Sequence, residues 1–180
     1  VRPDVPGIAD TAQARQPLDA FILARLEAVG LAPSPAATER ELVRRLHLDV
    51  LGLPPTYEEV EAYLADTKPD RWERLVDEVL SRPAYGERLG RQWLDVVRYA
   101  QTNGYERDTE KPFAWRYRDW VIRSIDADMP LDQFIQQQLA GDEMVGRKLE
   151  NLTAEEVSKL TATGFLRMAP DGTASGDVNQ

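Results

Sequence analysis

The chain has 180 residues, of which 42% are hydrophobic and 29% charged, a composition typical of a globular protein rather than a disordered one. It contains no cysteine, which excludes disulfides, thiolate metal ligands, a thiol nucleophile and covalent haem attachment within these residues. The formal net charge of −9 disfavours a general nucleic-acid-binding protein, and no apolar run approaches the ~20 residues that a membrane-spanning helix needs.

The N-terminal part begins as an arm and continues as a helix. Pro3, Pro6 and Gly7 oppose helix formation, so we expect residues 1–16 to be extended. Pro17 suits the first turn of a helix that continues to Gly30. Within that helix the apolar residues follow one another at helical spacing: Leu18, Phe21, Ile22, Leu26 and Val29.

Three further helix starts are predicted by capping-box spacing, in which Thr or Asp is followed three residues later by Glu. The pairs are Thr38 with Glu41, Thr56 with Glu59, and Asp70 with Glu73. Gly52, Pro54 and Pro55 end the first of these helices, which carries the apolar stripe Leu42, Val43, Leu46 and Val50.

Four helices are predicted in the remaining sequence. The first runs from about Tyr85 to Ala100 and should turn Leu89, Trp93, Val96 and Val97 inward. The others run from Pro112 to Ala127, from Pro130 until Gly141 ends the helix, and from a cap at Thr153 with Glu156 to Leu160. No sustained strand pattern is present. We therefore predict an all-α fold, a compact multi-helix array with an extended N-terminal arm (1–16), a helical domain (17–168) and a loop-like C-terminal tail (169–180), truncated from a longer chain.

The stretch RYAQTNGYERD, residues 98–108, is predicted to connect two helices. Asn103 and Gly104 suit backbone positions with positive φ. We expect the Arg and acid side chains of this loop to pair with the flanking helices.

The middle of the chain is locally basic and rich in aromatic residues. From Arg82 to Arg123 there are nine Lys/Arg against six Asp/Glu, whereas the rest of the chain has 13 against 25. One interpretation is a tryptophan core locked by pairs between Arg and acids such as Asp95 or Asp119. The other is an Arg-lined surface for a haem propionate, an acidic sugar or a partner protein. The candidate contact residues are Arg98, Asn103, Arg107, Trp115 and Arg118.

Other motifs give no catalytic or metal site. His47 is the only histidine and has no second ligand nearby in sequence, so we interpret it as a partly buried helix residue. GDEMVGRKL, residues 141–149, departs from a phosphate-binding loop because Arg147 separates the glycine from the lysine. Glu106, Asp108 and Glu110 lack the register of a calcium loop. Catalytic residues therefore stay unknown.

Four long segments resemble a planctomycete cytochrome-associated family, the second PSCyt domain of unknown function. They are residues 17–56 (PLDAFILARLEAVG…GLPPT), residues 85–108 (YGERLGRQWLDVVRYAQTNGYERD), residues 114–143 (AWRYRDWVIRSIDADM…LAGDE) and residues 161–172 (TATGFLRMAPDG). The resemblance implies a large exported protein of the periplasm or cell envelope, whose genes lie near polysaccharide-degrading functions. It also implies a c-type haem in the full-length protein, attached after the region that matches GFLRMAPDG, and none in this chain.

The resemblance supports two hypotheses of different classes. The first is a non-catalytic scaffold or interaction module for a haem-bearing downstream segment, a cytochrome c-like domain or another electron-transfer partner. The second is a module that binds or processes sulfated or acidic polysaccharide. Positions that match the family signature, and that we expect to serve structure first and contact second, are Trp93, Asp95, Arg98, Asn103, Gly104, Trp115, Arg118 and Asp142.

Overall fold

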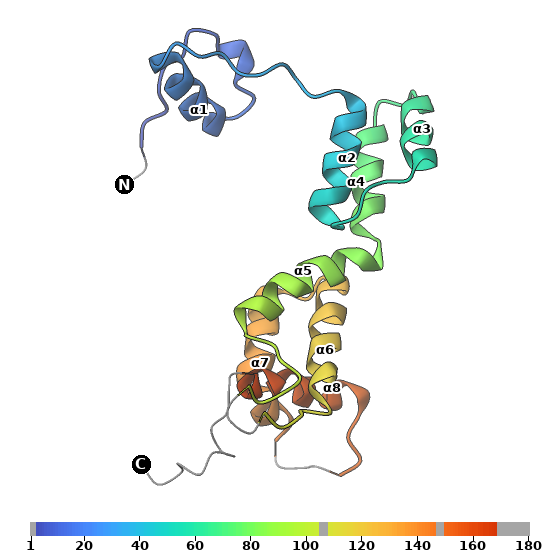
Figure 1. The fold of residues 1–180 in the computed structure, drawn as a ribbon. Coiled ribbons are helices and arrows are strands. Elements are labelled where there is room, and N and C mark those ends of the chain that lie inside the picture. The colour runs from blue at the N-terminus through green and yellow to red at the C-terminus, as the bar shows by residue number, and fades with distance from the viewer. Residues whose placement is uncertain (1–2, 105–107, 147–149, 169–180) are drawn as a thin grey trace. The chain divides into compact units, whose positions relative to one another are not determined.

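The computed structural model describes residues 3–104, 108–146 and 150–168 (Figure 1). It divides the chain into two compact units, Val1–Thr38 and Glu39–Gln180. The secondary structure of the described residues consists of eight α-helices, two 3-10 helices and one isolated antiparallel bridge. The all-α prediction is therefore confirmed, whereas the predicted tail lies outside the described residues.

The first unit contains η1 (Thr11–Gln13) and α1 (Pro17–Ala28). The Asp19 carboxylate caps α1 by accepting the backbone N–H groups of Arg15 at 2.8 Å and Gln16 at 3.0 Å. The backbone N–H of Ala9 donates to Glu27 at 3.0 Å and ties the otherwise extended arm to this helix. Apolar spacing predicted the helix correctly, yet its stripe is not buried: Leu18 is 64% exposed and Ile22 60%.

The second unit begins with α2 (Glu39–Val50), α3 (Tyr57–Ala65) and α4 (Arg71–Leu80). Their shared core consists of Val43, Leu51, Tyr63, Leu75 and Val79. Thr56 caps α3 as predicted, because its hydroxyl accepts the Glu59 N–H at 3.2 Å while Glu59 accepts the Thr56 N–H at 2.6 Å. The predicted cap at Asp70 is wrong: its side chain makes no cap hydrogen bond and instead pairs with Arg74 at 3.2 Å.

His47 is more deeply buried than the sequence predicted, with 1% of its surface exposed. Its Nδ1 lies 2.9 Å from the Val43 carbonyl, one helical turn earlier, and its Nε2 lies 4.0 Å from the Glu59 carboxylate. Within the described residues Nε2 has no hydrogen-bond partner. His47 is therefore a residue of α2, as predicted, and its ring is buried between α2 and α3.

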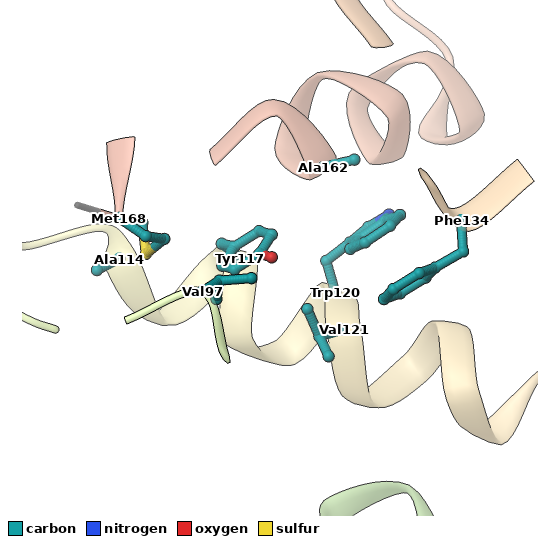
Figure 2. Close-up of a cluster of buried hydrophobic side chains, with 8 residues drawn as sticks. All are labelled: Val97, Ala114, Tyr117, Trp120, Val121, Phe134, Ala162 and Met168. Carbon is teal, nitrogen blue, oxygen red and sulfur yellow. The ribbon is translucent and has the colours of Figure 1, made fainter. Parts of the chain in front are cut away.

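The remaining helices are α5 (Pro83–Val96), α6 (Ala114–Asp126), α7 (Leu131–Val145) and α8 (Ala154–Ala162), followed by η2 (Thr163–Arg167). Their core is centred on Trp120, which stacks at 15° on both Tyr117 and Phe134, with ring centroids 6.3 and 5.1 Å apart (Figure 2). Ala162 is fully buried beside these rings. Thr153 caps α8 with Glu156 as predicted.

A buried network of neutral side chains ties α5, α6 and α7 together. The indole Nε1 of Trp93 donates to Gln138 Oε1 at 3.0 Å and to the Tyr117 hydroxyl at 3.1 Å. That hydroxyl donates to Gln138 Oε1 at 2.6 Å, and Gln138 Nε2 donates to the Phe134 carbonyl at 3.0 Å. The predicted Arg–acid lock is correct only in part: Asp119 does pair with an arginine, but that residue is Arg118 of the same helix, and the pair is partly exposed. Neutral groups cross a core at a lower desolvation cost than ions do.

The predicted end of α5 is wrong, and the predicted end of α7 is correct only in part. Helix α5 ends at Val96 rather than Ala100, and Val96 is 73% exposed, whereas Val97 and Trp93 do face the core. The prediction that a helix ends at Gly141 is correct in part: helical geometry breaks at Ala140, with φ −140° and ψ 23°, and then resumes. Gly141 itself is buried, and a side chain there would overlap the carbonyl of Lys159 on α8. The helix continues to Val145 and ends at Gly146, which has a φ of 77°.

Candidate binding groove

The C-terminus of α5 places Arg98 in a backbone conformation that usually belongs to glycine. Arg98 has a φ of 58°. Its N–H donates to the Asp95 carbonyl at 3.3 Å, and the N–H of Tyr99 donates to the Leu94 carbonyl at 2.9 Å. These two bonds form a Schellman motif, in which the residue after the C-cap is left-handed. An L-residue with a β-carbon is strained by about 1–2 kcal/mol in that position.

The loop that follows folds back on itself before α6. The Asn103 N–H donates to the Thr109 carbonyl at 2.9 Å, and a single antiparallel bridge joins Thr102 and Glu110. Gly104 has the predicted positive φ, at 66°, but Asn103 does not. The loop thus connects two helices as predicted, with a more ordered backbone than a simple turn.

Asp108 stabilises this loop from within. Hydrogen bonding to the Thr102 side chain and to the Gly104 N–H, which lies 2.8 Å away, lowers the pKa of Asp108 below its usual value. The prediction that the loop's acids pair with the flanking helices is therefore wrong for Asp108. Arg107 lies outside the described residues.

Beside this loop, two adjoining depressions form what we call the α5–α6 groove. One, of about 460 Å³, lies against the end of α5 and the loop, and the other, of about 540 Å³, lies between α5 and α6. They share Leu94, Asp95 and Tyr99. The charged side chains of the groove are balanced in number: Arg91, Arg98 and Arg118 against Glu87, Asp95 and Asp119.

The two predicted arginines of the groove differ in how they are engaged. Arg118 donates from Nε and Nη2 to the carboxylate of Asp119, at 2.8 and 2.7 Å, and this hydrogen bonding raises its pKa. Arg98 is exposed, and in the described part of the chain it forms no ion pair. Among the described residues its guanidinium, like that of the exposed Arg91 in the neighbouring depression, is available to an anionic ligand.

Comparison with known proteins gives a family. Residues 17–180 match PSCyt2, described as a protein of unknown function (DUF1549). The chain belongs to the PSCyt2 family. The resemblance seen in the sequence is thus confirmed over the same region. No curated protein and no solved structure matches the chain.

The PSCyt2 domain brings three of the five candidate residues to the groove. Arg98 and Asn103 line the depression at the loop, and Arg118 lines the one between α5 and α6. Trp115 lines neither depression; it is 44% exposed at the start of α6, where Arg116 lies over its ring at 5.6 Å.

Sequence reasoning left most groove residues out of its contact candidates, among them Arg91 and Tyr99, and named Asp95 only as an ion-pair partner and a family-signature position. Helical spacing gave no signal for Tyr99, which lies beyond the end of α5 at Val96. A signal was present for Arg91 and Asp95, which lie four positions apart within α5. Such residues share one face of a helix. Gln138, the acceptor at the centre of the core network, had no comparable signal.

Two further findings concern the described residues. Across residues 3–104, 108–146 and 150–168, no group of three or more His, Cys, Asp or Glu residues is arranged to hold a metal ion. In the same residues, no helix combines the length and apolarity needed to cross a membrane.

Proposed function

We propose that this PSCyt2 domain is a non-catalytic interaction module whose α5–α6 groove binds a haem-bearing segment or another electron-transfer partner. The observation that carries the proposal is the exposed Arg98 guanidinium, which has no ion pair among the described residues. Arg presents a fixed fork of donors that matches a carboxylate. Haem propionates and acidic protein side chains supply that group.

The strain at Arg98 supports a functional role. Backbone strain that glycine would relieve persists where the side chain itself is needed. The balanced charges of the groove favour recognition over bulk attraction, because a partner has to match both signs to dock. The proposed setting is the periplasm or cell envelope, as the family resemblance implies.

The test is a titration of the domain with a c-type haem peptide, a short Cys-x-x-Cys-His peptide with covalently attached haem and free propionates. We expect saturable changes in the Soret band and an affinity that falls as salt concentration rises. Methyl esterification of the propionates should weaken binding about tenfold, as should Arg98→Ala. Arg45→Ala, an exposed arginine on α2, serves as the matched control. The proposal would be contradicted if the wild type and Arg98→Ala bound the free and the esterified haem peptide with equal affinity.

A second candidate function, carbohydrate binding, is favoured by the depression beside the loop. Asp95, Tyr99 and Asn103 line it together with Arg98, and carboxylate, amide and aromatic groups are suited to sugar hydroxyls. A panel of neutral, sulfated and uronate-containing polysaccharides tests it by thermal shift. Stabilisation that is lost in Asn103→Ala but kept in Arg45→Ala would favour a sugar site; failure of every glycan alongside haem-peptide binding would favour the first function.

A further inference from the structure

A second hollow lies away from the α5–α6 groove, between the start of α6, α8 and η2. This α6–α8 trough has a volume of about 610 Å³ and is open along one side. Phe113, Leu152 and Val157 contribute apolar surface to it. Of the α5–α6 groove residues, only Met168 also lines the trough.

The charge of the trough is opposite to that of the whole protein. Its charged lining residues in the described structure are Lys111, Arg116 and Arg167, and none of its lining residues there is acidic. The chain as a whole has 31 acidic against 22 basic residues. The described lining of the trough therefore carries positive charge, which attracts anionic groups.

Arg116 is held in place for such a contact. Its guanidinium lies 5.0 Å from the centre of the Phe113 ring and 5.6 Å from that of Trp115. Cation–π contact with two rings restrains the position of the guanidinium. In the described part of the chain Arg116 forms no ion pair.

The aromatic residues beside Arg116 are unusually exposed for their size. Phe113 is 65% exposed and Trp115 44%, although both belong to the residue types that folding usually buries. Binding hot spots at protein interfaces are enriched in aromatic residues and arginine.

We propose that the α6–α8 trough binds an acidic amphipathic peptide segment of a partner protein. Apolar side chains of the peptide pack on Phe113 and Val157, while its carboxylates meet Arg116 at the rim. The open side favours a peptide over a small enclosed ligand, because charged side chains can keep part of their hydration while apolar ones are buried. This proposal does not depend on the α5–α6 groove.

The experiment measures fluorescence anisotropy of a labelled peptide of about twelve residues, with Glu and Leu placed on opposite faces of a helix. Two control peptides carry Lys in place of Glu or Ser in place of Leu. We expect saturable binding of the first peptide, with Arg116→Glu weakening it by about tenfold or more and Arg45→Glu, the same charge change on α2, leaving it intact. Both arginines are exposed, so both variants should fold.

A second readout locates the peptide. Arg116 lies over the Trp115 ring, so peptide binding at Arg116 should change tryptophan fluorescence in the wild type and change it less in Trp115→Phe. Three results would overturn the proposal: no saturable binding of the Glu/Leu peptide, equal binding of the Lys peptide, or insensitivity to Arg116→Glu. Sedimentation showing a dimer that Arg116→Glu dissociates would also overturn it, because a second copy of the chain would then occupy the trough.

Discussion

At the scale of single residues, Arg98 shows a conflict between backbone preference and side-chain identity. The Schellman motif at the end of α5 favours glycine, which adopts positive φ without strain, as Gly146 does at the end of α7. The chain instead places an exposed arginine there. A residue that weakens the helix end is more readily explained by contact with a partner than by stability.

Replacing Arg98 by Gly should separate stability from binding. We expect Arg98→Gly to raise the free energy of unfolding by about 1 kcal/mol, because the strain disappears. The same variant should lose haem-peptide affinity to the extent that Arg98→Ala does. Urea unfolding and the Soret titration measure the two effects on one preparation. A destabilised Arg98→Gly protein would show that the arginine stabilises the fold.

The raised pKa of the buried Tyr117 leads us to expect a loss of stability at alkaline pH. Burial raises the pKa of Tyr117 to about 12, although the hydrogen bond with Trp93 acts in the opposite direction. An unfolded tyrosine titrates near pH ~10, so the unfolded state releases this proton first. The contribution of the protonated Tyr117 to the free energy of unfolding is therefore complete below about pH 10 and is lost as pH rises towards about 12. Urea unfolding at pH values across this window measures the loss.

The matched variants for this titration are Tyr117→Phe and Tyr57→Phe. Tyr117→Phe should lose less stability between about pH 10 and 12 than the wild type, because it lacks the buried phenol. Below about pH 10 its free energy of unfolding should be lower than that of the wild type by about 1 kcal/mol, because the hydrogen bond from the hydroxyl to Gln138 is lost. Tyr57 is 71% exposed, so its variant should follow the wild-type curve. Identical slopes for all three proteins would refute the assignment.

At the scale of elements, the distance between packed helices depends on the residues at their points of contact. Helices α7 and α8 approach each other closely at Gly141, where α7 also departs from helical geometry at Ala140, with φ −140° and ψ 23°. Two glycines of this unit face obstacles of different kinds. A β-carbon on Gly141 would meet the Lys159 backbone, whereas one on Gly86 would meet the Asp126 side chain.

Alanine at these two glycines should therefore have unequal costs. Gly141→Ala should destabilise the protein by about 2 kcal/mol or more, because a backbone carbonyl cannot move without shifting α8. Gly86→Ala should cost less, since the Asp126 carboxylate can rotate away and alanine favours the helix by up to about 1 kcal/mol. Thermal and urea unfolding compare them. A Gly86→Ala protein less stable than Gly141→Ala would contradict this reading of the packing.

The helix caps give a second test at this scale. Thr153→Ala should lower the free energy of unfolding by about 1 kcal/mol, because the Thr153 hydroxyl accepts the Glu156 N–H at 3.2 Å. Asp70→Ala should change it by less than about 0.5 kcal/mol, since Asp70 makes no cap bond and only an exposed ion pair with Arg74. Chemical denaturation of both variants measures the two changes in the free energy of unfolding. Equal losses would mean that Asp70 caps α4 in solution.

At the scale of the whole molecule, the buried side chains gather in two clusters. One is formed mainly by α2, α3 and α4, and the other by α5 to α8 with η2. Both clusters draw their described residues from positions after Thr38, and in α1 only Ala20 is buried. The first unit thus contributes little to the described hydrophobic core.

Removal of residues 1–38 should consequently leave the second unit folded. We expect a protein that begins at Glu39 to keep its thermal midpoint within about 2 °C, because hydrophobic burial is the main source of stability and stays intact. Circular dichroism should lose only the signal of α1. A midpoint lowered by more than about 5 °C would show that the N-terminal unit stabilises the rest.

The amino-acid sequence by itself determined the helical class, the proline and glycine boundaries and the caps at Thr56 and Thr153, because these depend on contacts within about four residues. It also placed Arg98, Asn103 and Arg118 among the candidate residues that now line one groove. Tertiary structure decided which apolar faces of the second unit are buried, leaving Val96 exposed while enclosing His47 and Gln138. It also decided that the helical break next to Gly141 is a kink, and that Gly141 permits a close approach of α7 and α8. Burial depends on partners distant in sequence, so periodicity can indicate a face without showing what covers it.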